Sequence, residues 1–292
     1  MNRCLFVVGA LPNILMLLCT APAGAELTKT KLSKTDFGAI EYKIRLNVEG
    51  IQANGPIEET MAKIAAALDM CSVNSSAEGP GRRAYVGAPG LKLQKNNYIL
   101  RMGSPASFTL KLRYTNLADV VLLDGGNFNH SKYEIDHPGK NVYSISYGLS
   151  LNADEDYPDR VVNGKTLMAA LEKRYPDLAA YLQSLLGDTQ FIIPPQVETW
   201  VSGADVKAGT LKLHPGTLGM GLDIFRFPDD VMVELSFTRG MNDPAAAGAY
   251  REFTALLKAK GLLADRQMTK TSCYLDYWFV KHPDRLESNA KE

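Results

Sequence analysis

Alternation of charged and apolar residues in several short segments limits what this chain can fold into. Residues 39–48, 107–114 and 132–136 alternate charged or polar with apolar side chains, and Arg101 stands beside apolar neighbours. Successive side chains of a β-strand point to opposite faces, whereas the period of an α-helix is 3.6 residues. The pattern therefore predicts strands that each have one charged face.

The charged faces have two interpretations. On an open, half-solvated sheet they would simply meet water, which is the ordinary case for any single strand. On a closed sheet they would line a cavity, where Arg and Lys attract a polyanion and Glu and Asp can hold a divalent cation. Both interpretations stay open on the residues alone.

The remaining segments predict an α+β protein with a mainly antiparallel, curved or closed sheet. Helices are predicted over residues 56–71, over 166–186 with a break at Pro176, and from 242 to Gly261. Further strands are predicted at residues 83–86, 98–102, 142–149, 197–202, 209–213, 221–227, 231–238 and 273–280.

The N-terminal residues resemble a targeting signal. Residues 1–25 combine Arg3 with an apolar stretch over residues 4–19 and the small residues Ala23 and Ala25. This order predicts a secretory signal peptide that is cleaved after Ala25. An uncleaved membrane anchor is the alternative, which a proline and an asparagine inside the stretch disfavour. We therefore expect an exported protein, periplasmic or secreted, with no transmembrane segment after signal removal.

Composition and cysteine content narrow the function classes. The chain has 32 Lys+Arg against 32 Asp+Glu and is 46% hydrophobic, which excludes a disordered chain and argues against a globally basic nucleic-acid binder. No nucleic-acid partner is expected. Loss of the signal peptide would leave Cys71 and Cys273, which either pair in an oxidising compartment or are two separate buried thiols.

Several short motifs follow one another in the order found in one known family. Glu41-Tyr42-Lys43 resembles part of an E-x-E-x-K strand, Leu100-Arg101 part of an L-R-x-R strand, and Thr109-Leu110-Lys111 a T-L-K strand. Lys132-Tyr133-Glu134-Ile135-Asp136 matches a basic-x-acid-x-acid strand, and Glu234 lies in a segment that resembles an E-x-E strand. In this order and spacing, the chain resembles the CYTH superfamily, the triphosphate tunnel metalloenzymes.

The resemblance covers most of residues 39–275 and implies a fold and a site. The fold would be an antiparallel closed β-barrel, or tunnel, of about eight strands with flanking helices, in one domain over residues 26–281 with a flexible tail over 282–292. It implies a triphosphate ligand held by Lys43, Arg101, Lys111, Lys132 and Lys270, with Arg45 and Arg113 as further candidates. It implies Mg²⁺ or Mn²⁺ on Glu41, Glu134, Asp136 and Glu234, and it assigns no catalytic residue.

Three departures leave the activity open. Ala39, Gly103 and Ser236 stand where the family places charged tunnel residues, and two of these would be carboxylates. The resemblance predicts an exported protein that binds a triphosphate-containing compound, with metal-dependent triphosphatase activity if it is an enzyme. The alternative is a non-catalytic, exported anion-binding or structural β-barrel protein.

Overall fold

A computed structural model describes residues 28–49, 55–74, 80–124, 130–157 and 162–289. The predicted signal peptide lies outside these residues, so export stays a prediction. Among the described residues, none of the helices has both the length and the apolar character needed to cross a membrane.

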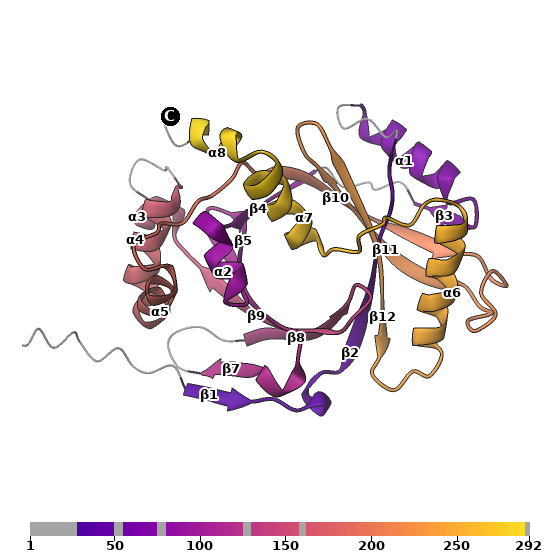
Figure 1. Cartoon of the computed structure of the whole chain (residues 1–292), viewed down its shortest axis with the longest axis horizontal. Coiled ribbons are helices and arrows are strands. Elements are labelled where there is room, and N and C mark those ends of the chain that lie inside the picture. Colours follow the sequence, from indigo (N-terminus) through magenta and orange to yellow (C-terminus); the bar gives the residue numbers. More distant parts are fainter. Residues whose placement is uncertain (1–27, 50–54, 75–79, 125–129, 158–161, 290–292) are drawn as a thin grey trace, which may run out of the picture.

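Nine strands form a ring that is closed by hydrogen bonds (Figure 1). Around the ring the order is β11–β12–β2–β8–β9–β6–β5–β4–β10, and β10 pairs with β11 to complete it. All these pairs are antiparallel except β2–β8, which is parallel. The strands are β2 (Ala39–Arg45), β4 (Gly81–Val86), β5 (Tyr98–Ser104), β6 (Ser107–Tyr114), β8 (His130–His137), β9 (Val142–Ser150), β10 (Val197–Val206), β11 (Leu218–Arg226) and β12 (Val231–Gly240).

Three short strands lie outside the ring. β3 (Cys71–Val73) adds to β10, and β1 (Thr28–Lys31) pairs with β7 (Val121–Asp124) in a separate two-stranded sheet. The prediction of a mainly antiparallel α+β sheet is therefore confirmed. About eight strands were predicted, the ring has nine, and one of its pairs is parallel.

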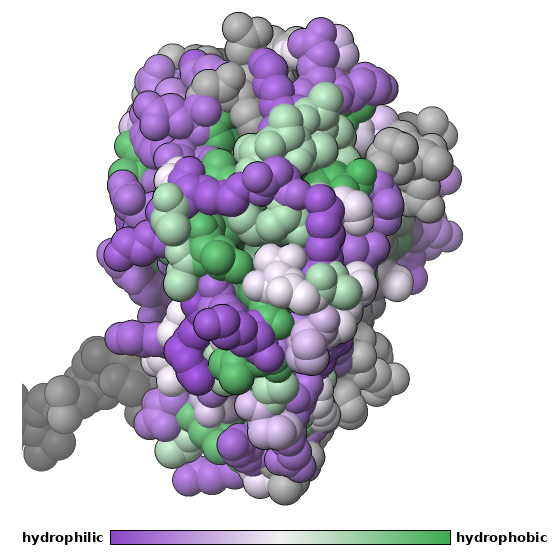
Figure 2. Space-filling model, turned by 90° about the vertical axis from the view of Figure 1, so that its right-hand side faces the viewer, coloured by the Kyte–Doolittle hydropathy of each residue, from purple (hydrophilic) through white to green (hydrophobic). Residues whose placement is uncertain are grey.

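Most of the helices lie beside the ring in two groups, and α7 (Lys270–Asp276) and α8 (Pro283–Asn289) lie apart from both (Figure 1). One group lies beside β11 and β12 and contains α1 (Ile57–Ala67) and α6 (Ala246–Ala259). The other lies beside β4, β5 and β9 and contains α2 (Lys92–Lys95), α3 (Ala153–Asp156), α4 (Gly164–Arg174) and α5 (Pro176–Leu186). On the outer face that carries α1 and α6, hydrophilic residues surround smaller apolar patches (Figure 2).

The hydrophobic core lies between the outside of the ring and these helices. In β6, Phe108, Leu110 and Leu112 are buried in one cluster with Leu171 of α4 and Leu182 of α5. The side chains between them on β6 point into the ring. A closed ring with its apolar faces outward and its charged faces inward decides between the two interpretations of the alternating segments.

The C-terminal region differs most from the prediction. Residues 273–280 were predicted to be a strand, but they form α7 (Lys270–Asp276) and a π-helical turn (Tyr277–Lys281). The buried residues of this segment recur at helical spacing: Cys273, Tyr274, Tyr277 and Trp278. The segment was predicted to be a strand because it is rich in aromatic residues.

The structure also answers three smaller questions that the sequence raised. Residues 209–213 form turns rather than a strand. A helix, α8 (Pro283–Asn289), lies where a flexible tail was predicted, and residues 290–292 lie outside the described part. Cys71 and Cys273 are buried thiols in different hydrophobic clusters and do not pair.

Candidate functional site

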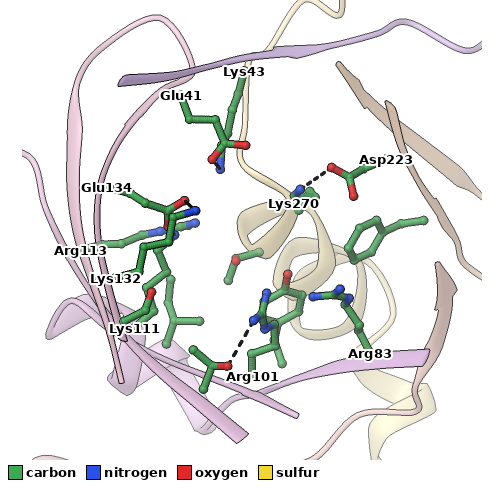
Figure 3. Close-up of a pocket in the computed structure, with 16 residues that line it drawn as sticks. Glu41, Lys43, Arg83, Arg101, Lys111, Arg113, Lys132, Glu134, Asp223 and Lys270 are labelled. Carbon is green, nitrogen blue, oxygen red and sulfur yellow. Dashed lines mark hydrogen bonds and ion pairs between the residues drawn. The ribbon is translucent and has the colours of Figure 1, made fainter. Parts of the chain in front are cut away.

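The interior of the ring contains a cavity of about 360 Å³ whose wall is strongly charged (Figure 3). The charged side chains come from β2, β4, β5, β6, β8, β11 and the first residue of α7. Seven are basic and three are acidic: Lys43, Arg83, Arg101, Lys111, Arg113, Lys132 and Lys270, with Glu41, Glu134 and Asp223. The fold thus gathers charges that are far apart in the sequence into one enclosed space.

The structure brings together most of the residues predicted for the site. All five predicted phosphate-binding residues line the cavity, as does Arg113: the five are Lys43, Arg101, Lys111, Lys132 and Lys270. Of the predicted metal ligands, Glu41 and Glu134 line it, whereas Asp136 and Glu234 are fully buried in its wall. Arg45 does not line it, and its Nη1 atom lies 3.9 Å from Sδ of Met268. The functional roles of these residues remain predictions.

Three carboxylates converge on one side of the cavity, and we call them the carboxylate cluster: Glu41, Glu134 and Asp136. Each offers an oxygen that lies within 4.8 Å of the other two, so their spacing could hold a metal ion. Parallel pairing places Glu41 of β2 in register with Asp136 of β8, which explains why residues so far apart in sequence meet. Glu134 lies two residues earlier on the same face of β8.

Basic side chains contact every member of the carboxylate cluster. Lys43 Nζ lies 2.7 Å from Asp136 Oδ1 and 3.0 Å from Glu41 Oε2. Lys111 Nζ lies 2.8 Å from Glu134 Oε2 and 3.3 Å from Asp136 Oδ2. Two further basic residues contact the carboxylate cluster: Arg113 Nη2 lies 3.5 Å from Asp136 Oδ2, and Lys132 Nζ lies 2.6 Å from Glu134 Oε1. Four cations therefore contact three carboxylates.

These contacts set the protonation states of the cluster. Burial alone would raise the pKa of Asp136, but Lys111, Lys43 and Arg113 outweigh it and hold that pKa well below its usual range. Burial likewise opposes ionisation of Glu134, yet Lys111 and Lys132 lower its pKa to about 2. For Lys43, burial lowers the pKa, but Asp136, Glu234 and Glu41 raise it above its ordinary value. Asp136, Glu134 and Lys43 are therefore charged at neutral pH. Burial lowers the pKa of Lys111, although Asp136 and Glu134 oppose that shift.

A second, smaller ion-pair group lies where α7 meets the wall. Lys270 Nζ lies 2.6 Å from Asp223 Oδ2 and 3.2 Å from Glu234 Oε1, and the two acids are cross-strand partners in β11 and β12. Thr269 caps α7 by accepting a hydrogen bond from the Ser272 amide, and this cap places Lys270 at the first helical position. Glu234 is therefore held by Lys270, and the carboxylate cluster does not include it.

Burial also perturbs this second group. Complete burial raises the pKa of Glu234, although Lys270 and Lys43 oppose the shift. Burial would lower the pKa of Lys270, but Glu234 and Asp223 outweigh it and raise that pKa. Glu234 and Lys270 therefore each shift the pKa of the other.

Two arginines on the opposite side of the cavity differ from these networks. Arg83 of β4 and Arg101 of β5 point into the cavity, and neither makes an ion pair with any residue in the described part of the chain (Figure 3). Arg101 Nη2 donates a hydrogen bond to Thr109 Oγ1 over 3.2 Å. Burial lowers the pKa of Arg101, but a guanidinium stays protonated at any physiological pH.

Sequence reasoning missed two charged residues of this cavity. Arg83 stands two positions before Tyr85, and both line the cavity, so the period of a strand contained the signal. Asp223 likewise alternates with the buried Leu222 and Ile224 in β11. Each of these segments contributes a single charge to the cavity, and one charge does not form the alternating pattern by which the other charged strand faces were predicted.

Comparisons with known proteins give little further information. No protein-family model matches the chain, and no curated protein matches it. Among solved structures, the chain is similar to HpAC1 from Hippeastrum, described as an adenylyl cyclase with a dominant triphosphatase activity. The two are 14% identical, the match covers 82% of this chain and 96% of that chain, and the TM-score is 0.41. This is a coarse likeness and does not define an activity.

Proposed function

We propose that this chain is a CYTH-like tunnel protein that binds a triphosphate or a similar short polyphosphate group in the cavity of the ring. The observation that carries the proposal is the excess of cations there. Seven basic residues line the cavity, and only five carboxylates, counting the buried Asp136 and Glu234, lie in its wall. An anion with several negative charges would balance this excess.

The chemistry and the size of the cavity both suit phosphate oxygens. A guanidinium presents a planar fork of N–H donors that matches phosphate, and Arg83 and Arg101 are the two cavity cations without a carboxylate partner among the described residues. Ligand pockets in proteins begin at about 300 Å³, so a cavity of about 360 Å³ suits a small ligand. Its wall lies inside a closed ring, where charge interactions are stronger than in water.

The metal implied by the resemblance fits the residues only in part. Glu41, Glu134 and Asp136 have the spacing and the oxygen atoms that Mg²⁺ or Mn²⁺ would require. However, the ammonium group of Lys43 already contacts two of them, so the donor set is not open to a second cation. We therefore propose binding and derive no hydrolytic step through a metal.

Calorimetric titration of the purified mature chain with tripolyphosphate tests this proposal. We expect saturable 1:1 binding that weakens with salt and is tighter for tripolyphosphate than for pyrophosphate or orthophosphate, since more contacts to phosphate oxygens form. Lys95→Ala is the control, because Lys95 is an exposed lysine outside the cavity and its loss should leave the affinity unchanged.

A phosphate-release assay in the same solutions, with Mn²⁺ added, separates a binding protein from an enzyme. Binding without release supports the proposal as stated. Release that disappears in Glu41→Ala would show a triphosphatase instead. The absence of saturable binding to all three anions at low salt would contradict the proposed function.

A further inference from the structure

We propose that Lys43 takes the position of a metal ion in the carboxylate cluster, so that this chain binds its polyphosphate without a divalent cation. The inference rests on the proposed function for the identity of the ligand. It is carried by the position of the Lys43 ammonium, 3.0 Å from Glu41 and 2.7 Å from Asp136.

The backbone fixes Lys43 at this position. Glu41 and Lys43 lie two residues apart on β2 and therefore share its inner face. The parallel pairing of β2 with β8 then brings Asp136 into register with Glu41. Lys43 is only 5% exposed, and its cross-strand partner on β12 is Ser236, a neutral residue. The ammonium thus lies between two carboxylates at ion-pair distance, and the charge of the more distant Glu234 also stabilises it.

The charge balance of the cluster argues against an additional cation. Mg²⁺ and Mn²⁺ bind carboxylate, carbonyl, water and phosphate oxygens, and a positive charge close to those oxygens repels the ion. Here three carboxylates already contact four cations, which are Lys43, Lys111, Arg113 and Lys132. A divalent ion would have to displace the buried Lys43 from Glu41 and Asp136. The fourth predicted ligand, Glu234, lies outside the cluster, with its Oε1 atom 3.2 Å from Lys270 Nζ.

Lys43 can also act on the ligand directly. An ammonium group has three N–H donors, and its contacts with Glu41 and Asp136 account for two of them. Because Lys43 lines the cavity, its third donor can point at a phosphate oxygen. Lys43 would then link carboxylates to phosphate as a bound metal does, but with one charge and no exchangeable water ligand.

Titration with Mn²⁺ alone, followed by the electron paramagnetic resonance signal of the unbound ion, tests the inference. The wild-type chain should show no saturable 1:1 site. Lys43→Ala opens the space between Glu41 and Asp136 and removes a like charge. It should gain a saturable 1:1 site that binds Mn²⁺ at least about tenfold more tightly than any residual, non-saturating binding to the wild type. Adding Glu41→Gln to Lys43→Ala should abolish that site.

Lys132→Ala is the charge-matched control. It also removes one positive charge that contacts the cluster, but the Lys132 side chain is 63% exposed and forms its ion pair with Glu134. If Lys43 occupies the metal position, this control should gain no comparable Mn²⁺ site. A gain equal to that of Lys43→Ala would mean that net charge alone decides, which overturns the inference.

Two results on the wild-type chain decide the matter even if Lys43→Ala does not fold. A wild-type 1:1 Mn²⁺ site that disappears in Glu41→Gln would overturn the inference, as would tripolyphosphate binding that is lost in EDTA. Binding that changes less than about threefold on EDTA addition supports it. A wild-type chain that binds no polyphosphate would contradict the proposed function, whereas the Mn²⁺ titration would still decide the role of Lys43.

Discussion

Two sides of the same cavity handle charge in opposite ways. On the side that we call the paired wall, Glu41, Lys43, Lys111, Glu134 and Asp136 neutralise one another within ion-pair distance. On the side that we call the arginine wall, Arg83 and Arg101 make no ion pair with a carboxylate in the described part of the chain, although the charge of Glu134 still acts on Arg101. From this comparison we propose two tasks: the paired wall holds the ring together, and the arginine wall supplies the attraction for an anion.

Electrostatics in a buried site explains this division. A buried ion pair contributes little net stability compared with apolar residues, but removal of one partner leaves an uncompensated charge and is costly. A buried cation without a partner, in contrast, already carries a desolvation cost that only an anionic ligand can offset. Mutations in the paired wall should therefore act mainly on stability, and mutations in the arginine wall mainly on affinity.

The largest effect is expected at the centre of the paired wall. Asp136→Asn keeps the shape of the side chain but leaves Lys43, Lys111 and Arg113 close together without their common carboxylate. We expect the free energy of unfolding to fall by about 3–5 kcal/mol, measured by urea denaturation at pH 7. Asp188→Asn, in an exposed loop position, is the matched control and should change it by less than about 0.5 kcal/mol. A loss below about 1 kcal/mol for Asp136→Asn would contradict a structural role for the paired wall.

The arginine wall should give the opposite result. The double substitution Arg83→Ala and Arg101→Ala removes the unpaired charges, so tripolyphosphate affinity should fall about 100-fold, or about 2.7 kcal/mol. The free energy of unfolding without ligand should be unchanged or higher, because two half-buried charges without an ion-pair partner are lost.

Arg82→Ala is the control for the arginine wall. Arg82 is the neighbour of Arg83 on β4, but it is exposed and does not line the cavity. If the double variant lost less than about threefold in affinity by calorimetry, the anion would have to be held by the paired wall, and the division into two tasks would be wrong.

Much of the paired wall could be predicted from the sequence because it depends on local pattern. The two-residue period of residues 107–114 and 132–136 put Lys111 and Glu134 on charged strand faces, and both line the cavity. A strand that is apolar on one face and charged on the other has few other ways to bury itself.

The parts that could not be predicted depend on contacts between distant segments. The position of the Lys43 ammonium follows from the parallel pairing of β2 with β8. The sequence of β2 alone does not indicate which strand pairs with it. The C-terminal aromatic residues suited a strand by propensity, but packing around Tyr274 and Trp278 favours α7 and the turn after it. Tertiary context decided both outcomes.

The smallest of the three effects concerns the edge of the paired wall and depends on pH. Lys111 and Lys132 hold the pKa of Glu134 at about 2, against an ordinary value of 4.5. A carboxylate with a depressed pKa contributes stability above its unfolded-state pKa and loses it as the pH falls through the folded-state value. The contribution of Glu134 should thus be complete above about pH 5 and decline between about pH 4.5 and pH 2.

Glu134→Gln removes this titration while keeping a hydrogen-bond acceptor for Lys111. Relative to the wild type, the variant should lose about 2 kcal/mol of unfolding free energy at pH 7, and the difference should shrink as the pH approaches 3. Urea denaturation at several pH values measures both numbers. Because Lys132 is largely exposed and Lys111 also contacts Asp136, this loss should be smaller than that of Asp136→Asn. A difference that stayed constant from pH 7 to pH 3 would mean that Glu134 stabilises the ring through packing and not through its charge, and the paired wall would then depend on Asp136 alone.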